Sequence, residues 1–139
     1  MSNLHPVFVH FPFALLLVAL LLEIAAIFFK RDEFSGAAWW NQILGTIGLA
    51  CAVASGLLAA QNVQMDAPAR ALFDTHQQIA FLSAASFAGL LFWRLSAKGK
   101  IPGHQRHLFL VLFAAAVLLM AAGAWLGGEL VYRHAVGVR

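Results

Sequence analysis

Residues 108–128 read LFLVLFAAAVLLMAAGAWLGG, and this stretch contains no charged side chain. A helix that crosses the hydrocarbon core of a bilayer needs about 20 mostly apolar residues. Inside lipid the segment must also pair its own backbone polar groups, which a helix does along its length. The stretch therefore predicts a membrane-spanning helix, which we place at about residues 108–132.

Three further stretches meet the same criterion and predict helices at about 7–29, 38–60 and 69–95. Within their apolar centres the only charged residue is Glu23. Hydrophobic residues make up 62% of the chain and charged residues 11%, whereas soluble domains are about 45–50% apolar and about 25% charged. We therefore expect an all-α, integral membrane four-helix bundle that forms one transmembrane domain over residues 1–139, with the lipid bilayer as its surroundings.

The basic residues predict the orientation of this bundle. Most of them lie in or beside the connections near residues 30 and 100, namely Lys30, Arg31, Arg94, Lys98, Lys100 and Arg106. Cytoplasmic loops carry an excess of Lys and Arg. We therefore expect both termini on the non-cytoplasmic side (N-out, C-out), and we interpret the positive charge as a determinant of topology, with no nucleic acid as partner.

Histidines gather at the predicted outer end. Counting about 1.5 Å per residue from the inner end of each helix places His10, His76, Gly127 and Glu129 at nearly one depth, just below the outer interface. His5 and His134 lie further out by the same count. Imidazoles from two helices commonly hold the iron of a b-type haem, so the pattern predicts a cofactor site.

The preferred hypothesis is a small cytochrome-like subunit that binds one haem b and transfers electrons, rather than a stand-alone enzyme. His10 and His76 would be the axial ligands, with His134 as the substitute. The remaining predicted cofactor-binding residues are His5, Arg133 and Gly127, of which Arg133 would meet the haem propionates. The expected partners are a larger redox complex, a quinone or an exterior electron carrier.

Two alternatives use the same residues. His10, His76 and Glu129 form a set of two imidazoles and a carboxylate that suits non-haem iron or zinc. In the other alternative the chain is a non-catalytic scaffold or accessory subunit whose histidines serve structure. Small residues recur at every fourth position of the second helix (Gly48, Ala52, Gly56 and Ala60), which favours either close helix packing or room for a flat cofactor.

Two residues within the first helix need a structural account. Pro12 removes a helical hydrogen bond, so the helix is expected to kink there or to begin near Phe11. Glu23 is expected to face the interior of the bundle, because a carboxyl group in hydrocarbon is costly. Thr46 is the nearest predicted polar partner of Glu23. The carboxyl group of Glu23 either takes part in proton or quinone chemistry or links two helices.

Both ends of the chain carry specific motifs, LHPVFVHFP at 4–12 and GGELVYRHAVGV at 127–138. Together with His76 they resemble a bacterial family of four-helix membrane proteins, domain of unknown function 2231. The resemblance implies a location in the bacterial cytoplasmic (inner) membrane. Ala135 stands where the family usually has glycine, so a less sharp bend after His134 is expected.

Overall fold

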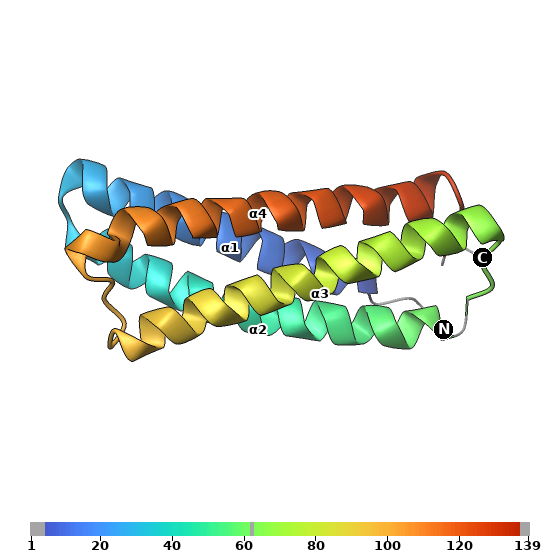
Figure 1. Ribbon diagram of the computed structural model, residues 1–139, viewed down its shortest axis with the longest axis horizontal. Helices are drawn as coiled ribbons and strands as arrows, with labels where there is room; N and C mark the ends of the chain where they lie inside the picture. The colour runs from blue at the N-terminus through green and yellow to red at the C-terminus, as the bar shows by residue number, and fades with distance from the viewer. Residues whose placement is uncertain (1–4, 62, 137–139) are drawn as a thin grey trace.

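The protein folds into four long helices in this computed structural model, which describes residues 5–61 and 63–136, with side chains from residue 9 onward. The helices are α1 (His5–Phe29), α2 (Asp32–Ala60), α3 (Ala67–Ser96) and α4 (Gly103–Tyr132). They run alternately up and down with short connections (Figure 1). The described residues contain no strand, so the predicted all-α four-helix architecture is confirmed. The orientation in the membrane stays a prediction.

The helices form a ring in which each packs against its neighbours in the sequence and α4 closes against α1. The α1–α2 and α3–α4 hairpins are the closely packed pairs, and the two hairpins meet less closely. The beginning of α1 and the end of α4 lie at the same end as the α2–α3 connection (Figure 1). We call this the His76 end, and the opposite end, with connections 30–31 and 97–102, the Arg94 end.

Two helices begin earlier than the apolar stretches indicate, because their first turns are polar. Helix α2 begins at Asp32 rather than at residue 38, and α4 begins at Gly103 rather than at residue 108. Acidic side chains in the first turn of α2, Asp32 and Glu33, interact favourably with the helix dipole. Hydropathy marks the part of a helix that lies in hydrocarbon, and these first turns extend beyond that part.

Helix α1 continues through Pro12 and begins at His5, so the alternative in which it begins near Phe11 is wrong. Neighbouring helices can accommodate a proline within a membrane-spanning helix. The Pro12 ring is buried against α2 at Gly48, where an added Cβ would lie 3.4 Å from the Pro12 Cβ. The proline therefore contributes to the packing of α1 on α2.

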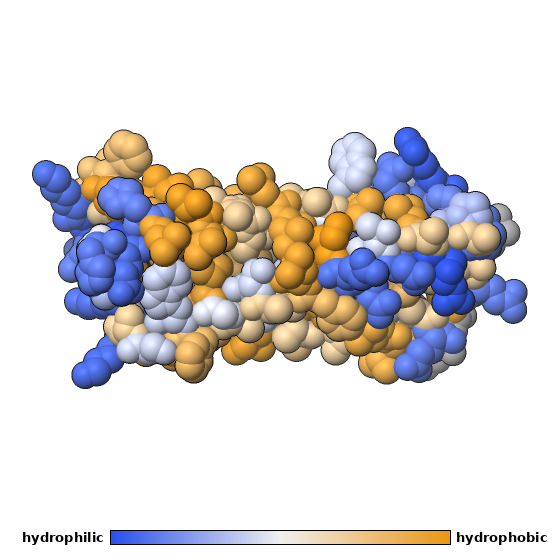
Figure 2. Space-filling model, viewed as in Figure 1, coloured by the Kyte–Doolittle hydropathy of each residue, from blue (hydrophilic) through white to orange (hydrophobic). Residues whose placement is uncertain are grey.

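A hydrophobic band separates two hydrophilic ends of the molecule (Figure 2). Large apolar side chains are strongly exposed on this surface, including Phe28 at 80%, Phe92 at 72% and Leu118 at 71%. A soluble monomer rarely exposes so much contiguous apolar surface, and all four helices are long and apolar enough to cross a membrane. At about 1.5 Å per residue, helices of this length exceed the roughly 30 Å of hydrocarbon, so their ends reach the headgroup region.

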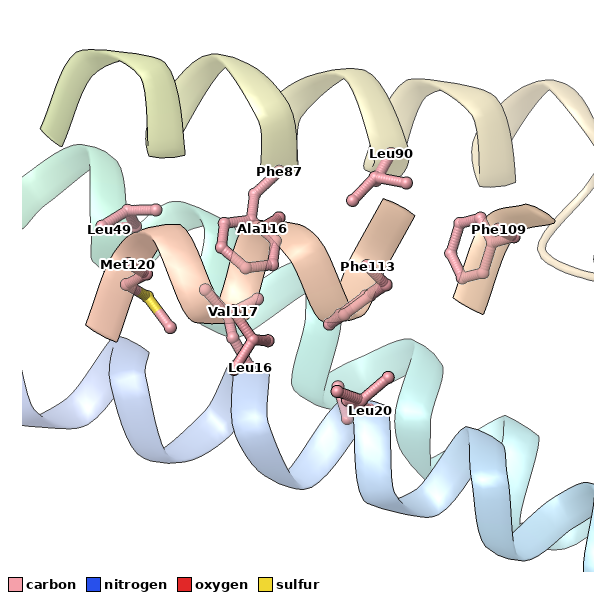
Figure 3. Close-up of a cluster of buried hydrophobic side chains, with 11 residues drawn as sticks. Leu16, Leu20, Leu49, Phe87, Leu90, Phe109, Phe113, Ala116, Val117 and Met120 are labelled. Carbon is pink, nitrogen blue, oxygen red and sulfur yellow. The ribbon is translucent and has the colours of Figure 1, made fainter. Parts of the chain in front are cut away.

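The hydrophobic core occupies the middle of the bundle and the half towards the Arg94 end. Its side chains converge from all four helices (Figure 3). Phe113 meets Phe87 with ring centroids 5.4 Å apart and Phe109 at 5.7 Å. Gly45 allows α1 to approach α2 closely, since an added Cβ there would lie 2.7 Å from the Leu16 Cγ. The core aromatics do not extend to the His76 end, where the packing changes.

Candidate functional site

A cavity of about 170 Å³ lies between all four helices at the His76 end. Its wall is almost wholly apolar, and small residues on α2 and α4 create much of the space. Among the residues of the wall are Val9, Phe13, Ala52, Gly56, Ala60, Phe73, His76, Ala80, Ser83, Met120, Gly123 and Gly127. The predicted stripe of small residues therefore divides by role: Gly48 packs against α1, and the other three members line the cavity.

His76 is held in a defined orientation at this cavity. Its Nδ1 lies 2.9 Å from the carbonyl oxygen of Gly123. A carbonyl oxygen only accepts hydrogen bonds, so Nδ1 carries the hydrogen and donates. In the neutral ring, Nε2 then has a free lone pair for a hydrogen-bond donor or a metal ion.

Gly127 provides the surface on which the His76 ring rests. An added Cβ at Gly127 would lie 3.1 Å from Cε1 of His76 and 3.9 Å from Nε2. The sequence predicts that these two residues lie at one depth on different helices, and in the structure they are in contact. Close packing of the imidazole on α4 thus explains this glycine.

Gln77 and Ser83 are the other polar residues of the wall, and Ser83 is the buried one of the two. Its side chain is 1% exposed, and its Oγ has no hydrogen-bond partner among the described residues. It lies two helical turns from His76 on the same face of α3. A buried hydroxyl group without a partner costs free energy, about 1–3 kcal/mol, and a ligand with a polar atom at this point would remove that cost.

Three of the other predicted cofactor residues, His10, His134 and Arg133, lie outside the cavity wall. The side chain of His10 is exposed on α1, and His134 is half-buried beyond the end of α4. Arg133 is largely exposed, and its Nε lies 2.9 Å from Oε2 of Glu129. The side chain of His5 lies outside the described part of the chain. Of the six predicted cofactor residues, the structure therefore brings His76 and Gly127 together at the cavity.

The predicted metal set of His10, His76 and Glu129 is not assembled. Within residues 5–61 and 63–136, no three His, Cys, Asp or Glu side chains gather so that they could hold a metal ion. Glu129 instead pairs with Arg133 one turn later on α4. The structure gives the non-haem metal alternative no support.

A second polar centre, buried at the Arg94 end, was not predicted. The Oε1 of Glu23 lies 2.6 Å from Nη2 of Arg94 and accepts a hydrogen bond of 2.9 Å from the Ser35 hydroxyl. Arg106 Nη2 lies 3.4 Å from the other carboxylate oxygen. Thr46, the predicted partner, instead donates to a carbonyl oxygen of its own helix. The prediction of Thr46 as the partner of Glu23 is wrong. It compared the depths of polar residues along the first two helices and did not include the cations of α3 and α4.

Arg94 joins three helices through this centre. Its Nε donates to the Gly99 carbonyl oxygen at 3.0 Å, its Nη1 to Gln42 Oε1 at 3.2 Å, and its Nη2 to the Ser35 carbonyl oxygen at 2.8 Å. The guanidinium also lies over the Trp39 ring, 5.3 Å from its centroid. The side chain is 1% exposed, so this buried cation is fully surrounded by acceptors and an aromatic face.

The end of α3 positions Gly99 for this contact. Gly99 N donates to the Arg94 carbonyl oxygen and Lys98 N to the Leu95 carbonyl oxygen, both at 2.9 Å. Lys98 and Gly99 have positive φ angles of 54° and 83°, so the segment forms a Schellman motif. The sequence carried a signal for the buried arginine, since Ser83, Phe87, Leu90 and Arg94 recur at helical spacing and are all buried on α3.

Four helices that are long and apolar enough to cross a membrane, packed around a buried ion-paired centre, are the architecture of a multi-pass α-helical membrane protein. The family model described as "Predicted membrane protein (DUF2231)" matches residues 1–139, and the chain belongs to this family. No curated protein and no solved structure gives a significant match to the chain. The family description names no activity, so the function is inferred from the site.

Proposed function

We propose that this protein binds a redox carrier dissolved in the bilayer, a hydroquinone, in the cavity beside His76, and that it serves membrane electron transfer. The observation that carries the proposal is a pair of polar groups, His76 and Ser83, in a wall whose only other polar side chain among the described residues is Gln77. His76 offers an acceptor at Nε2, and Ser83 offers a buried hydroxyl group without a partner. A hydroquinone has one hydroxyl group for each of them.

The size of the cavity fits a single ring. A dry cavity of about 150 Å³ accommodates a benzene-sized molecule, and this cavity measures about 170 Å³. Leu57 and Val131 belong both to the wall and to the exposed surface. They lie where the isoprenoid tail of a hydroquinone would pass from the cavity into lipid.

The spacing of the two polar groups also fits. Seven residues separate His76 from Ser83, which corresponds to about 10.5 Å along the helix axis. The two oxygens of a hydroquinone ring are roughly 5–6 Å apart, and a hydrogen bond of about 2.8 Å at each end gives about 11 Å. The two residues are therefore far enough apart along α3 for one ring to lie between them.

The protonation of His76 favours the reduced carrier over the oxidised one. Because Nδ1 donates to the Gly123 carbonyl oxygen, Nε2 of the neutral ring is an acceptor. A hydroquinone hydroxyl group donates to such an atom, whereas a quinone carbonyl oxygen only accepts.

Haem b is the second candidate, and one observation favours it. Metal-binding histidines commonly donate their other ring N–H to a carbonyl oxygen, as His76 does. The described wall, however, contains no second histidine, and a haem is much larger than one ring. Haem binding would thus require the two hairpins to separate and a sixth ligand from elsewhere.

The test is a binding titration of purified protein in lipid nanodiscs with a short-tailed hydroquinone kept reduced. We expect His76→Leu to weaken binding about tenfold or more and Ser83→Ala about threefold to tenfold, the loss of one hydrogen bond each. Ser86→Ala is the matched control, because the exposed Ser86 hydroxyl group bonds the Leu82 carbonyl oxygen of its own helix. His107→Leu controls for loss of an exposed imidazole at the other end.

An absorption spectrum of the same preparation distinguishes the two carriers. A Soret band that disappears in His76→Leu would assign the site to haem. Hydroquinone binding without a Soret band would support the first proposal. If the protein shows neither, or if His76→Leu and His107→Leu behave alike, the redox proposal is refuted and the scaffold alternative gains.

A further inference from the structure

A second cavity, of about 330 Å³, lies at the Arg94 end, where connection 97–102 approaches the beginning of α2. Its wall carries several charged side chains together with Ser35, Trp39 and Ile101. The charged members are Glu23, Asp32, Lys98, Lys100 and Arg106. This cavity is separate from the one beside His76, and nothing in the proposed function uses it.

The charges around this cavity do not balance. Arg94 lies beside Glu23 and neutralises its carboxylate. Three cations, Lys98, Lys100 and Arg106, then face one carboxylate, Asp32, which leaves a net charge of +2. A concave site with such an excess attracts an anion.

Arg106 has unused hydrogen-bond donors at this site. A guanidinium carries five N–H donors, and the part of the chain that the structure describes provides Arg106 with one contact, the 3.4 Å interaction with Glu23. The side chain is 26% exposed, so it is anchored at its tip by the buried centre and still borders the cavity. Arginine in this position suits the paired oxygens of a phosphate group.

Exposed apolar side chains at the same end of the molecule indicate where the anion comes from. Phe28 and Phe29 at the end of α1 and Trp40 on α2 are 80%, 67% and 63% exposed. Phe28 and Phe29 end the apolar α1, so these side chains lie near the end of a candidate membrane span. A phosphate group in the cavity would thus have acyl chains next to an apolar wall.

We infer that the cavity at the Arg94 end binds the phosphate group of an anionic phospholipid, with Arg106, Lys98 and Lys100 as its cationic contacts. Clusters of Lys and Arg at the membrane surface attract anionic lipids. The bound phosphate would complete the charge balance of the buried centre. It would also join the connection 97–102 to the beginning of α2.

Native mass spectrometry of the full chain, released from detergent with defined lipids, tests this inference. We expect phosphatidylglycerol to remain bound where phosphatidylcholine, which has no net charge, does not. The double variant Lys98→Gln/Lys100→Gln should weaken phosphatidylglycerol binding about tenfold or more. Both lysines are exposed, so the variant keeps the buried centre intact.

Lys30→Gln is the matched control, because Lys30 is an exposed cation at the same end that is not part of the wall. Equal binding of the two lipids, or equal losses in Lys30→Gln and the double variant, would overturn the inference. A third arm adds inorganic phosphate. If phosphate alone displaces phosphatidylglycerol at millimolar concentration, the site takes a free anion and the lipid assignment is wrong.

Discussion

Replacing Glu23 by glutamine removes the charge that balances the buried Arg94 and leaves the volume of the side chain unchanged. Glu23 is 2% exposed, and its Oε1 lies 2.6 Å from the guanidinium. Two unit charges about 4 Å apart at an effective dielectric constant of about 20 interact by roughly 4 kcal/mol. Breaking one side of a buried pair costs about 3–5 kcal/mol, and here Arg106 also loses its contact. We therefore expect Glu23→Gln to lower the free energy of unfolding by about 3–5 kcal/mol.

The measurement is reversible unfolding in mixed micelles, followed by far-UV circular dichroism as the denaturing detergent is raised. Glu33→Gln is the control, since Glu33 pairs with Arg31 on the surface and its side chain is 75% exposed. An exposed pair contributes about 0–1 kcal/mol. Glu23→Gln should therefore lower the free energy of unfolding several-fold more than Glu33→Gln does.

A double-mutant cycle separates charge from shape. Replacing both Glu23 and Arg94 by methionine removes the pair without leaving an unpaired charge, which is often close to neutral. The double variant should cost less than the sum of the single variants by about 2 kcal/mol or more. If Glu23→Gln costs no more than Glu33→Gln, the buried centre does not hold the hairpins together and the reasoning fails.

Three further substitutions test the packing at particular positions. Gly45→Ala should lower the free energy of unfolding by about 1–3 kcal/mol, measured in the same micelles, because its Cβ would meet Leu16 Cγ at 2.7 Å; an unchanged stability would contradict the close approach. Gly127→Ala gains about 1 kcal/mol of helix propensity, but its Cβ would lie 3.1 Å from Cε1 of His76 and displace the ring. The free energy of unfolding should therefore change little, while hydroquinone affinity falls several-fold in the titration. Ala135→Gly should stabilise the protein by up to about 1 kcal/mol and so raise its thermal midpoint, because Ala135 has a positive φ of 50°. A lower midpoint would argue against this positive φ angle.

The departure at Ala135 shows how a sequence expectation can fail at a single residue. A less sharp bend was expected after His134 because alanine avoids the left-handed region. The structure has alanine in that region all the same, and Val136 N donates to the Leu130 carbonyl oxygen at 3.0 Å. This hydrogen bond offsets a local preference of about 1 kcal/mol.

Depth along a helix could be predicted from the sequence, but direction around its axis could not. The count that brought His76 and Gly127 to one level was right, because rise per residue is nearly constant. The same count placed His10 at that level, and its side chain is exposed. The packing of α1 on α2 at Gly45 and Gly48 decides which face of α1 is buried. The sequence does not reveal this face, because the apolar stretch of α1 has no polar side opposite to it.

The buried centre was missed for a related reason. Arg94 was interpreted as a topology determinant, since a cation at the end of an apolar stretch normally reaches the headgroup region. Its position one turn after Leu90 on the buried stripe of α3 indicates the opposite. A charged residue on the packed face of a membrane helix needs a partner of opposite charge. Glu23 is the carboxylate within the apolar stretches that can provide it.

The order of these groups along the chain has a consequence for biosynthesis. Glu23, Ser35 and Gln42 all belong to the first hairpin, whereas Arg94 ends the third helix. Synthesis proceeds from the N-terminus, so the acceptors are available in the bilayer before the guanidinium is made. A cation that would be costly alone in hydrocarbon is therefore made after the carboxylate that pairs with it.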